Sequence, residues 1–250
     1  MRVSLLTHTP EPERLVVAAA LLCYQKGGPE RAYERAGDAK LRARLFEELV
    51  RQGHGSVLEH PSFTFGIEGI SRACSHQLVR HRICSFNQQS QRYVDMGAPD
   101  YFVKPPSLAE DEEFDQAVAA MVGYYRETVE RLKGEGKEGE QAREDARYIL
   151  PNATKTNIIW TTNLRNLLHV SRVRMCSRAQ WEIRQVMFAC RRAVEAVSPL
   201  TAKYMVVKCH PNAMGYCDEE FRSCGFRPRR DAVIPADAEC PPGPGWRDEG

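Results

Sequence analysis

Fourteen consecutive residues, "RHRICSFNQQSQRY" (80–93), concentrate side chains that can bind anions and heterocycles. Three of them are arginines, whose planar guanidinium groups suit phosphate or carboxylate better than lysine does. The amides of Asn87, Gln88, Gln89 and Gln91 each carry a donor beside an acceptor. That pattern can bind the imide or amide edge of a ring such as uracil or a flavin. The segment therefore favours a ligand that joins a phosphate to a heterocycle.

Two simpler interpretations of this segment compete with ligand binding. Arg80, His81 and Arg82 could stabilise the negative C-terminal end of a preceding helix, an effect worth roughly 0.3–1 kcal/mol. Such an interaction does not require the serines, the asparagine and the arginine that follow. A nucleic-acid-binding surface is less favoured, because few aromatic side chains beyond Phe86 and Tyr93 interleave with the cations.

The composition of the whole chain narrows the class of protein. With 35 basic and 33 acidic residues among 250, the formal net charge is +2, so no global basic surface for nucleic acid is expected. No apolar run approaches the ~20 residues of a membrane span, and the N-terminus lacks a signal-peptide core. Nine cysteines, an odd number without CxxC pairs, are typical of reduced thiols. We expect a compact cytoplasmic protein that binds neither membrane nor nucleic acid.

Hydrophobic periodicity and helix-ending residues predict a helix-rich chain with few strands. Strands are predicted at 2–8, 61–69 and 155–163, with Phe63, Phe65 and Ile67 on one face of the second. Ser71 is a candidate N-cap. Helices are predicted at 12–27, 40–52 (closed by Gly53), 71–82, 108–133, 140–150, 164–174 and 179–197.

The order of these elements favours an α+β fold, because no alternation of strand and helix connects the strands as in a parallel sheet. The segment 80–93 begins at the end of a helix and continues into a loop or a short extended stretch. Beyond about Lys208 the composition changes to Cys, Pro, Gly and charge. We therefore expect a catalytic domain over 1–207 and an irregular tail of unknown role over 208–250.

The segment 80–93 resembles the RHR-x2-S-x-N-x2-S-x-R-Y signature of flavin-dependent thymidylate synthases and matches every fixed position. The resemblance extends over about residues 40–205. Further similar blocks are "GHGSVLEH" (53–60, the family's GH-x4-EH), "ARYILP" (146–151), "WTTNLRNLLHVSRVR" (160–174) and "AQWEIR" (179–184).

This resemblance implies reductive methylation of dUMP to dTMP. Methylenetetrahydrofolate would supply the carbon, FAD reduced by NADPH would supply the hydride, and tetrahydrofolate would be released. It also implies a homotetramer of helix-rich α+β protomers, each built around a small, mostly antiparallel sheet, with active sites that draw residues from several subunits.

The resemblance also implies roles for individual residues, and it implies no metal ligand. Arg174 would be catalytic, because a fixed guanidinium near the uracil carbonyl stabilises negative charge on the ring. His54 matches a histidine near the flavin ring and the folate. The positions implied for dUMP are Gln77, Arg80, Gln88, Ser90, Arg92, Arg147 and Arg174, and those for FAD are His54, Ser56, Arg80, His81, Arg82, Gln88, Asn163, Arg165 and His169.

The chain departs from the pattern at two positions. Gln88 stands where some relatives carry glutamate, which changes the charge but keeps a hydrogen-bonding group. Arg178 stands where some relatives carry histidine, and no role is assigned to it. Taken singly, Arg174 could be a solvated helix arginine and His54 a structural histidine.

Other chemistries remain open. A thiol mechanism would use Cys84 or Cys176 as the nucleophile, with a pKa lowered by Arg82 or Arg174, although most free cysteines are small buried hydrophobes. A zinc module in the tail could draw on Cys209, His210, Cys217, Cys224 and Cys240, but these lack the closely spaced pairs usual for zinc. A pyrimidine-nucleotide sensor or an RNA-binding protein is the alternative if flavin does not bind.

Overall fold

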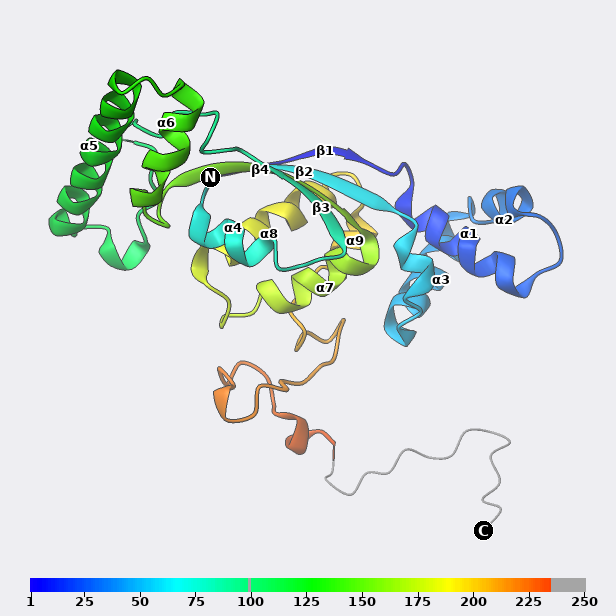
Figure 1. Ribbon diagram of the computed structural model, residues 1–250. Helices are drawn as coiled ribbons and strands as arrows, with labels where there is room; N and C mark the ends of the chain where they lie inside the picture. Colours follow the sequence, from blue (N-terminus) through cyan, green and yellow to red (C-terminus); the bar gives the residue numbers. More distant parts are fainter. Residues whose placement is uncertain (99, 235–250) are drawn as a thin grey trace, which may run out of the picture.

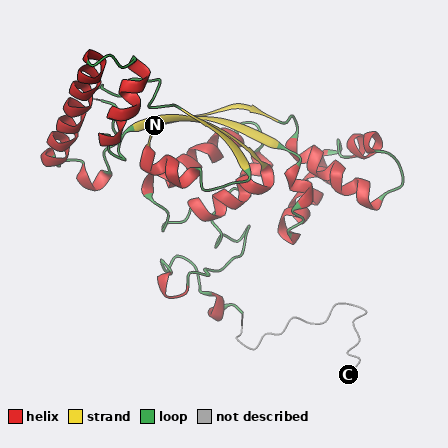
Figure 2. Ribbon diagram, in the orientation of Figure 1, coloured by secondary structure: helices red, strands yellow, loops and turns green. Residues whose placement is uncertain are grey.

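The computed structural model describes residues 1–98 and 100–234, and its centre is a four-stranded sheet (Figures 1 and 2). All pairings in this sheet are antiparallel, in the order β1–β2–β4–β3. The predicted α+β class with a small antiparallel sheet is confirmed. The strands are β1 (Arg2–His8), β2 (Ser62–Ser71), β3 (Cys84–Gln88) and β4 (Lys155–Asn163).

Alternating apolar residues give the sheet one buried face. Phe63, Phe65 and Ile67 of β2 are fully buried, as the period of two predicts. Trp160 of β4 stacks on Phe65, with ring centroids 5.4 Å apart. Each of these large side chains contributes about 1.5–3 kcal/mol by leaving water, so the pairing of β2 with β4 is the main anchor of the core.

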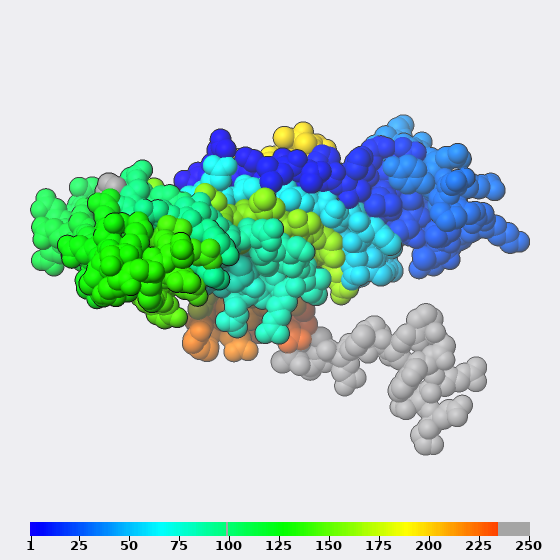
Figure 3. Space-filling view, turned by 45° about the horizontal axis from the view of Figure 1, so that its top comes forward, coloured from blue at the N-terminus to red at the C-terminus, as the bar shows by residue number. Residues whose placement is uncertain are grey.

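The helices form three groups around the sheet. In Figure 1, α1–α3 lie at one end of the sheet, α5 and α6 at the other end, and α4, α7, α8 and α9 cover the buried face. Figure 3 shows the resulting elongated shape, with α5 and α6 in green at one end and the N-terminal helices in blue at the other. The helices are α1 (Pro12–Tyr24), α2 (Pro29–Arg35), α3 (Ala39–Gln52), α4 (Arg72–Leu78), α5 (Glu112–Gly134), α6 (Gly139–Ala146), α7 (Leu164–Arg174), α8 (Trp181–Glu195) and α9 (Pro199–Ala202).

Local signals explain several helix boundaries. Ser71 caps α4 by accepting a hydrogen bond from the Cys74 N–H, as predicted. Asn163 caps α7 in the same way, through the N–H of Asn166. Gly53 ends α3 in the left-handed conformation, at φ 75°, which favours glycine.

The predicted strands and most of the predicted helices are confirmed, with three corrections. The helix predicted to continue to Arg82 ends at Leu78, because the chain turns there to enter β3. The helix predicted from Leu108 begins at Glu112, since the side chain of Asp111 caps it. The short helices α2 and α9 were not predicted.

The described residues form two apolar cores. The main core joins the sheet to α1, α3, α4, α7 and α8, whereas α5 and α6 enclose a smaller cluster around the fully buried Tyr125 and Met96. Within the described ranges, no helix combines the length and apolar character that a membrane crossing requires.

A buried carboxylate joins α8 to the start of α4. Glu182 is 2% exposed and accepts hydrogen bonds from both the N–H (2.7 Å) and the hydroxyl of Ser71. Glu182→Ala should lower the free energy of unfolding by about 2–4 kcal/mol, because two buried donors lose their acceptor. Urea titration measures the change. Glu130→Ala, which removes an exposed ion pair with Lys133, should change it by no more than about 0.5 kcal/mol; equal effects would contradict the assignment.

Candidate functional site

The fold brings the segment 80–93 beside the block 160–174. After α4, the chain turns through residues 79–83 and enters β3, which pairs with β4 from Cys84 opposite Thr162 to Gln88 opposite Ile158. β4 then runs directly into α7. Two segments that lie far apart in the sequence therefore place their polar residues along the same strand pair.

The end of α7 places Arg174 against the turn after α4. The Nε of Arg174 donates to Nε2 of His81 at 3.0 Å, and its Nη2 lies 3.4 Å from the carbonyl oxygen of Gln77. The ring of His169 meets that of His81 edge-on, with centroids 6.1 Å apart. Four of the residues predicted to touch nucleotide or flavin thus form one cluster.

The charges in this cluster determine its protonation. Burial, with the nearby charges of Arg174 and His169, lowers the pKa of His81 to about 4. His81 is therefore neutral near pH 7 and accepts the Arg174 hydrogen bond at Nε2, which leaves its proton on Nδ1. Burial also lowers the pKa of Arg174, but an arginine stays charged. A neutral imidazole thus holds a partly desolvated guanidinium in place.

A cleft of about 490 Å³ opens beside this cluster, at the start of α7. Asn163, Arg165 and His169 line it, together with Gly53 and Gly55. His54 and Ser56 belong to the same short segment of chain as these glycines. Asn163, Arg165 and His169 thus share one opening, whereas His54 and Ser56 are not among its lining residues, and Nε2 of His54 lies 2.9 Å from the Gln52 side-chain oxygen.

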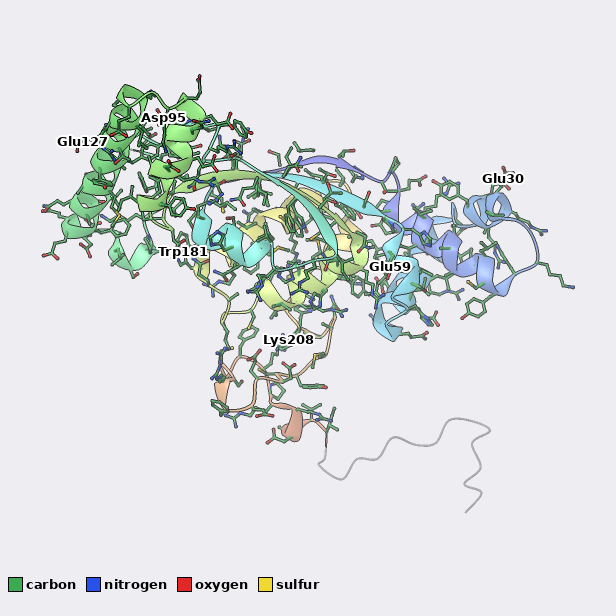
Figure 4. The ribbon with its side chains drawn as sticks, viewed as in Figure 1. Glu30, Glu59, Asp95, Glu127, Trp181 and Lys208 are labelled. Carbon is green, nitrogen blue, oxygen red and sulfur yellow. The ribbon has the colours of Figure 1, made fainter. Side chains whose placement is uncertain are left out.

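The cleft suits an anionic cofactor. The N–H groups of Leu164 and Asn166 in the first turn of α7 are bonded to Pro61 and Asn163, so what favours an anion here is the positive end of the helix dipole. Arg165 at this end forms an ion pair with Glu59, which is labelled in Figure 4. A Cβ on Gly55 would lie 2.9 Å from the Arg165 side chain. The absence of a side chain at position 55 therefore allows Arg165 to pack against Gly55 in the wall of the cleft. Arg165 and the N-terminal end of α7 therefore fit the diphosphate of FAD.

A third group of predicted residues lies next to α6. Arg92 forms ion pairs with Glu140 (2.7 Å) and Glu144 (2.9 Å), and its N–H donates to the Ser90 hydroxyl at 3.1 Å. Arg147 follows α6 directly and donates from Nε to the carbonyl oxygen of Glu144. Ser90 thus contacts Arg92, and Arg92 and Arg147 both contact Glu144, while two carboxylates neutralise Arg92. Their role as phosphate ligands stays a prediction.

The remaining predicted residues are less closely gathered. The amide nitrogen of Gln88 donates to the hydroxyls of Ser75 (3.0 Å) and Thr156 (3.1 Å), so this side chain points into the protein. Arg80 and Arg82 are exposed, on the turn between α4 and β3. The structure does not bring Arg80 into the phosphate group around Arg92.

The residues around the cleft and the predicted phosphate-binding residues (Ser90, Arg92 and Arg147) lie at opposite ends of the sheet. The N–H of Gln89, just before Ser90, donates to the carbonyl oxygen of Asn157, whereas the cleft begins at Asn163. Six residues of strand at about 3.3 Å each separate these points by about 20 Å. A compact ligand cannot touch both groups of one chain.

Two cations near these groups were missed by the sequence analysis. Burial and the charge of Arg147 lower the pKa of Arg72, so these two arginines lie close together beside the phosphate group. Arg172 lines the cleft, and burial lowers its pKa too. The sequence held a signal for each. Arg72 directly follows the Ser71 cap, and Arg172 lies two residues before Arg174.

The geometry weakens the thiol mechanism. The thiol of Cys84 donates to the carbonyl oxygen of His81 at 2.7 Å, and burial raises its pKa. A raised pKa removes the thiolate that nucleophilic attack requires.

Fold and site together define a helix-rich α+β protein with a cleft lined by Asn163, Arg165 and His169 at one end of a small antiparallel sheet and the arginines Arg92 and Arg147 at the other. The chain matches the family described as thymidylate synthase complementing protein over residues 4–200. Curated relatives are named flavin-dependent thymidylate synthase. One from Nitratidesulfovibrio vulgaris is 41% identical over 241 residues, covering 93% of this chain and 97% of the relative. One from Geobacter sulfurreducens is 44% identical over 230 residues, covering 90% and 94%. The chain belongs to the flavin-dependent thymidylate synthase family.

Solved structures share the fold. ThyX from Helicobacter pylori, complexed with FAD and dUMP, gives a TM-score of 0.66 at 22% identity and covers 82% of this chain and 100% of that one. The UMP/dUMP methylase PolB from Streptomyces cacaoi, bound with 5-Br dUMP, gives 0.62 at 28% identity and covers 81% and 93%.

The low pKa of His81 leads to a pH prediction. In the unfolded chain the imidazole titrates near 6.5 and in the fold at about 4, so between these values the unfolded chain binds more protons. The contribution of His81 to stability is therefore present above pH 6.5 and is lost as the pH falls toward 4. NMR titration of the ring should give a pKa near 4. The stability of His81→Asn should fall less steeply over this pH range than that of the wild type; parallel curves and a pKa near 6.5 would contradict the neutral-acceptor role.

Proposed function

We propose that this chain catalyses the reductive methylation of dUMP to dTMP. The observation that carries the proposal is the Arg174–His81 pair, because it fixes a partly desolvated guanidinium beside the cleft. A guanidinium held at the uracil carbonyl stabilises negative charge on the ring and makes carbon 5 a better nucleophile. Methylenetetrahydrofolate is the proposed carbon donor and NADPH the reductant.

The cleft at the start of α7 is the proposed FAD site. FAD, when bound and reduced, supplies the hydride that converts the transferred carbon to a methyl group. The N-terminus of α7 and Arg165 bind the diphosphate, and Asn163 and His169 form the walls. In binding diphosphate, Arg165 exchanges its ion pair with Glu59 for one with the cofactor. By family resemblance, His54, Ser56, Arg82 and Gln88 complete the flavin contacts and His54 also meets the folate.

The dUMP site is proposed to combine two groups of residues. Ser90, Arg92 and Arg147 bind the phosphate, and Gln77, Arg80, Gln88 and Arg174 surround the uracil and the sugar. Glu140 and Glu144 neutralise Arg92 in this structure. The phosphate of dUMP takes the place of these two carboxylates at Arg92. An uncharged nucleoside cannot displace them and should therefore bind more weakly.

The separation of the two groups supports a shared active site. Within one chain, the predicted phosphate-binding residues lie about 20 Å from the cleft, measured along strand β4. We propose that the chain forms a homotetramer. In it, the predicted phosphate-binding residues of one subunit (Ser90, Arg92 and Arg147) meet the Arg174 cluster and the cleft of another subunit. Residues 1–207 form the proposed catalytic domain, and the proposed location is the cytoplasm.

Arg174→Ala should raise the activation free energy of the reaction by several kcal/mol. Each ~1.4 kcal/mol lowers the turnover rate tenfold. The assay supplies dUMP, methylenetetrahydrofolate, NADPH and FAD and follows dTMP and tetrahydrofolate by chromatography. Arg174→Lys should recover little activity, because lysine keeps the charge but cannot hold the planar geometry. Both variants should retain flavin absorption.

Controls separate this role from general damage. Arg192→Ala removes an exposed arginine of α8 and should leave turnover unchanged. Cys84→Ala should keep most of its activity. Dihydrofolate as the product, or a folded, flavin-loaded Cys84→Ala that is inactive, would overturn the proposed mechanism in favour of a thiol route.

A shared site predicts complementation between variants from opposite ends of the sheet. Arg92→Ala and Arg174→Ala should each be nearly inactive alone. After co-expression, some sites of the mixed oligomers contain both wild-type arginines, and activity should return. The matched control is co-expression of Arg92→Ala with Arg147→Ala, which both change the predicted phosphate-binding residues. This mixture should restore no activity. A monomer with full activity by light scattering, or no recovery in either mixture, would contradict the shared site.

A further inference from the structure

The tail folds without an apolar core. Within residues 208–234, Cys209 and Cys217 alone are buried, and neither belongs to the two apolar clusters. Phe221 and Phe226 are 77% and 74% exposed. The segment's regular structure is limited to short 3-10 turns. A unit this small and open usually needs a covalent or metal cross-link to stay folded.

The tail nevertheless docks on the turn between α7 and α8, residues 175–180. The N–H of Lys208 donates to the Arg172 carbonyl oxygen at 3.1 Å, and Arg178 donates to the carbonyl oxygen of Arg222 at 3.0 Å. Figure 4 shows Lys208 beneath α7 at the start of the tail. These are few, partly exposed polar contacts, which contribute little stability by themselves.

Four thiols gather where the tail meets this turn. Contacts between their sequence neighbours bring these cysteines together. Lys208, next to Cys209, forms an ion pair at 2.6 Å with Asp218, next to Cys217, and Arg178, two residues after Cys176, donates to the carbonyl oxygen of Arg222, two residues before Cys224. Arg178 also forms an ion pair with Glu219, two residues after Cys217, at 3.8 Å. Backbone hydrogen bonds with Pro228 and Arg230 hold Cys217 in place. Three cysteines of the tail thus face one from the turn that follows Arg174.

We propose that Cys176, Cys209, Cys217 and Cys224 bind one zinc ion, which fastens the tail to the catalytic domain. Zinc in structural sites prefers four ligands in a tetrahedron, with thiolates among the commonest. This set replaces the ligands weighed from sequence. Nδ1 of His210 accepts a hydrogen bond from the Asn212 N–H at 3.0 Å, and Cys240 lies outside the described residues.

Metal binding must draw the sulfur atoms together. Among the described residues, no three candidate ligands already stand at coordination spacing. The adjustment is small for thiols on irregular backbone, because rotation about χ1 moves each sulfur without breaking a helix or strand. Metal-ligand bonds then supply the stability that the tail's few contacts lack.

Metal analysis of the full-length, untagged protein tests the proposal. After dialysis against metal-free buffer, mass spectrometry of the elements should find one zinc per chain. Cys176→Ser should lower zinc content at least severalfold and lower the melting temperature, although Cys176 is 33 residues away from Cys209 in the sequence. Cys176→His, which offers another zinc ligand, should retain more metal than Cys176→Ser. Cys23→Ser, which removes a thiol on α1, is the matched control and should keep its zinc.

A measurement on the wild-type protein keeps the test decisive if a variant fails to fold. A mercurial reagent should release the zinc into a chromogenic chelator, and alkylation before release should label Cys23 but spare the four proposed ligands. Zinc-free protein, bound iron in place of zinc, two disulfides among the four cysteines, or full zinc retention in Cys176→Ser would each overturn the proposal.

Discussion

The pairing of β4 with both β2 and β3 is the constraint on which the rest of the structure depends. β2 leads into α4, β4 leads into α7, and β3 carries the amide-rich part of the segment 80–93. The stacking of Trp160 between Phe65 and Phe86 links all three strands through one buried ring. A register shift of one residue would turn each strand over and would move Arg174 away from His81.

The same sheet both gathers and separates the functional residues. Antiparallel pairing places the start of β3 beside the end of β4, so the turn that bears His81 meets the helix that bears Arg174 and His169. It sends the end of β3, and with it Arg92, toward α6 at the opposite end. Carboxylates neutralise the cations at both ends, Glu59 at Arg165 and Glu140 with Glu144 at Arg92. An anion that bound at either end would have to displace a resident carboxylate.

The tail shows the opposite way to stabilise a segment. The catalytic part relies on large buried side chains, whereas the described tail buries two thiols and exposes two phenylalanines. Because it docks on the turn directly after Arg174, its stability is coupled to the position of the end of α7. A cross-link at this point would hold both the tail and the last turn of the helix that carries the guanidinium.

The sequence by itself determined most of the helices and strands and the class of chemistry to expect. Alternating apolar residues specified β2 and β4, and the local cap at Ser71 specified the start of α4, because these signals act over a few residues. The residue types of 80–93 predict a ligand that joins a phosphate to a heterocycle. The sequence did not determine the low pKa of His81, the inward direction of Gln88, the cation Arg72 beside Arg147, the separation of the two binding groups, or the meeting of Cys176 with the tail thiols. Each depends on strand order and on burial between segments far apart in the chain. Only the tertiary structure sets those distances, because pairing and packing, rather than local spacing, decide which side chains become neighbours.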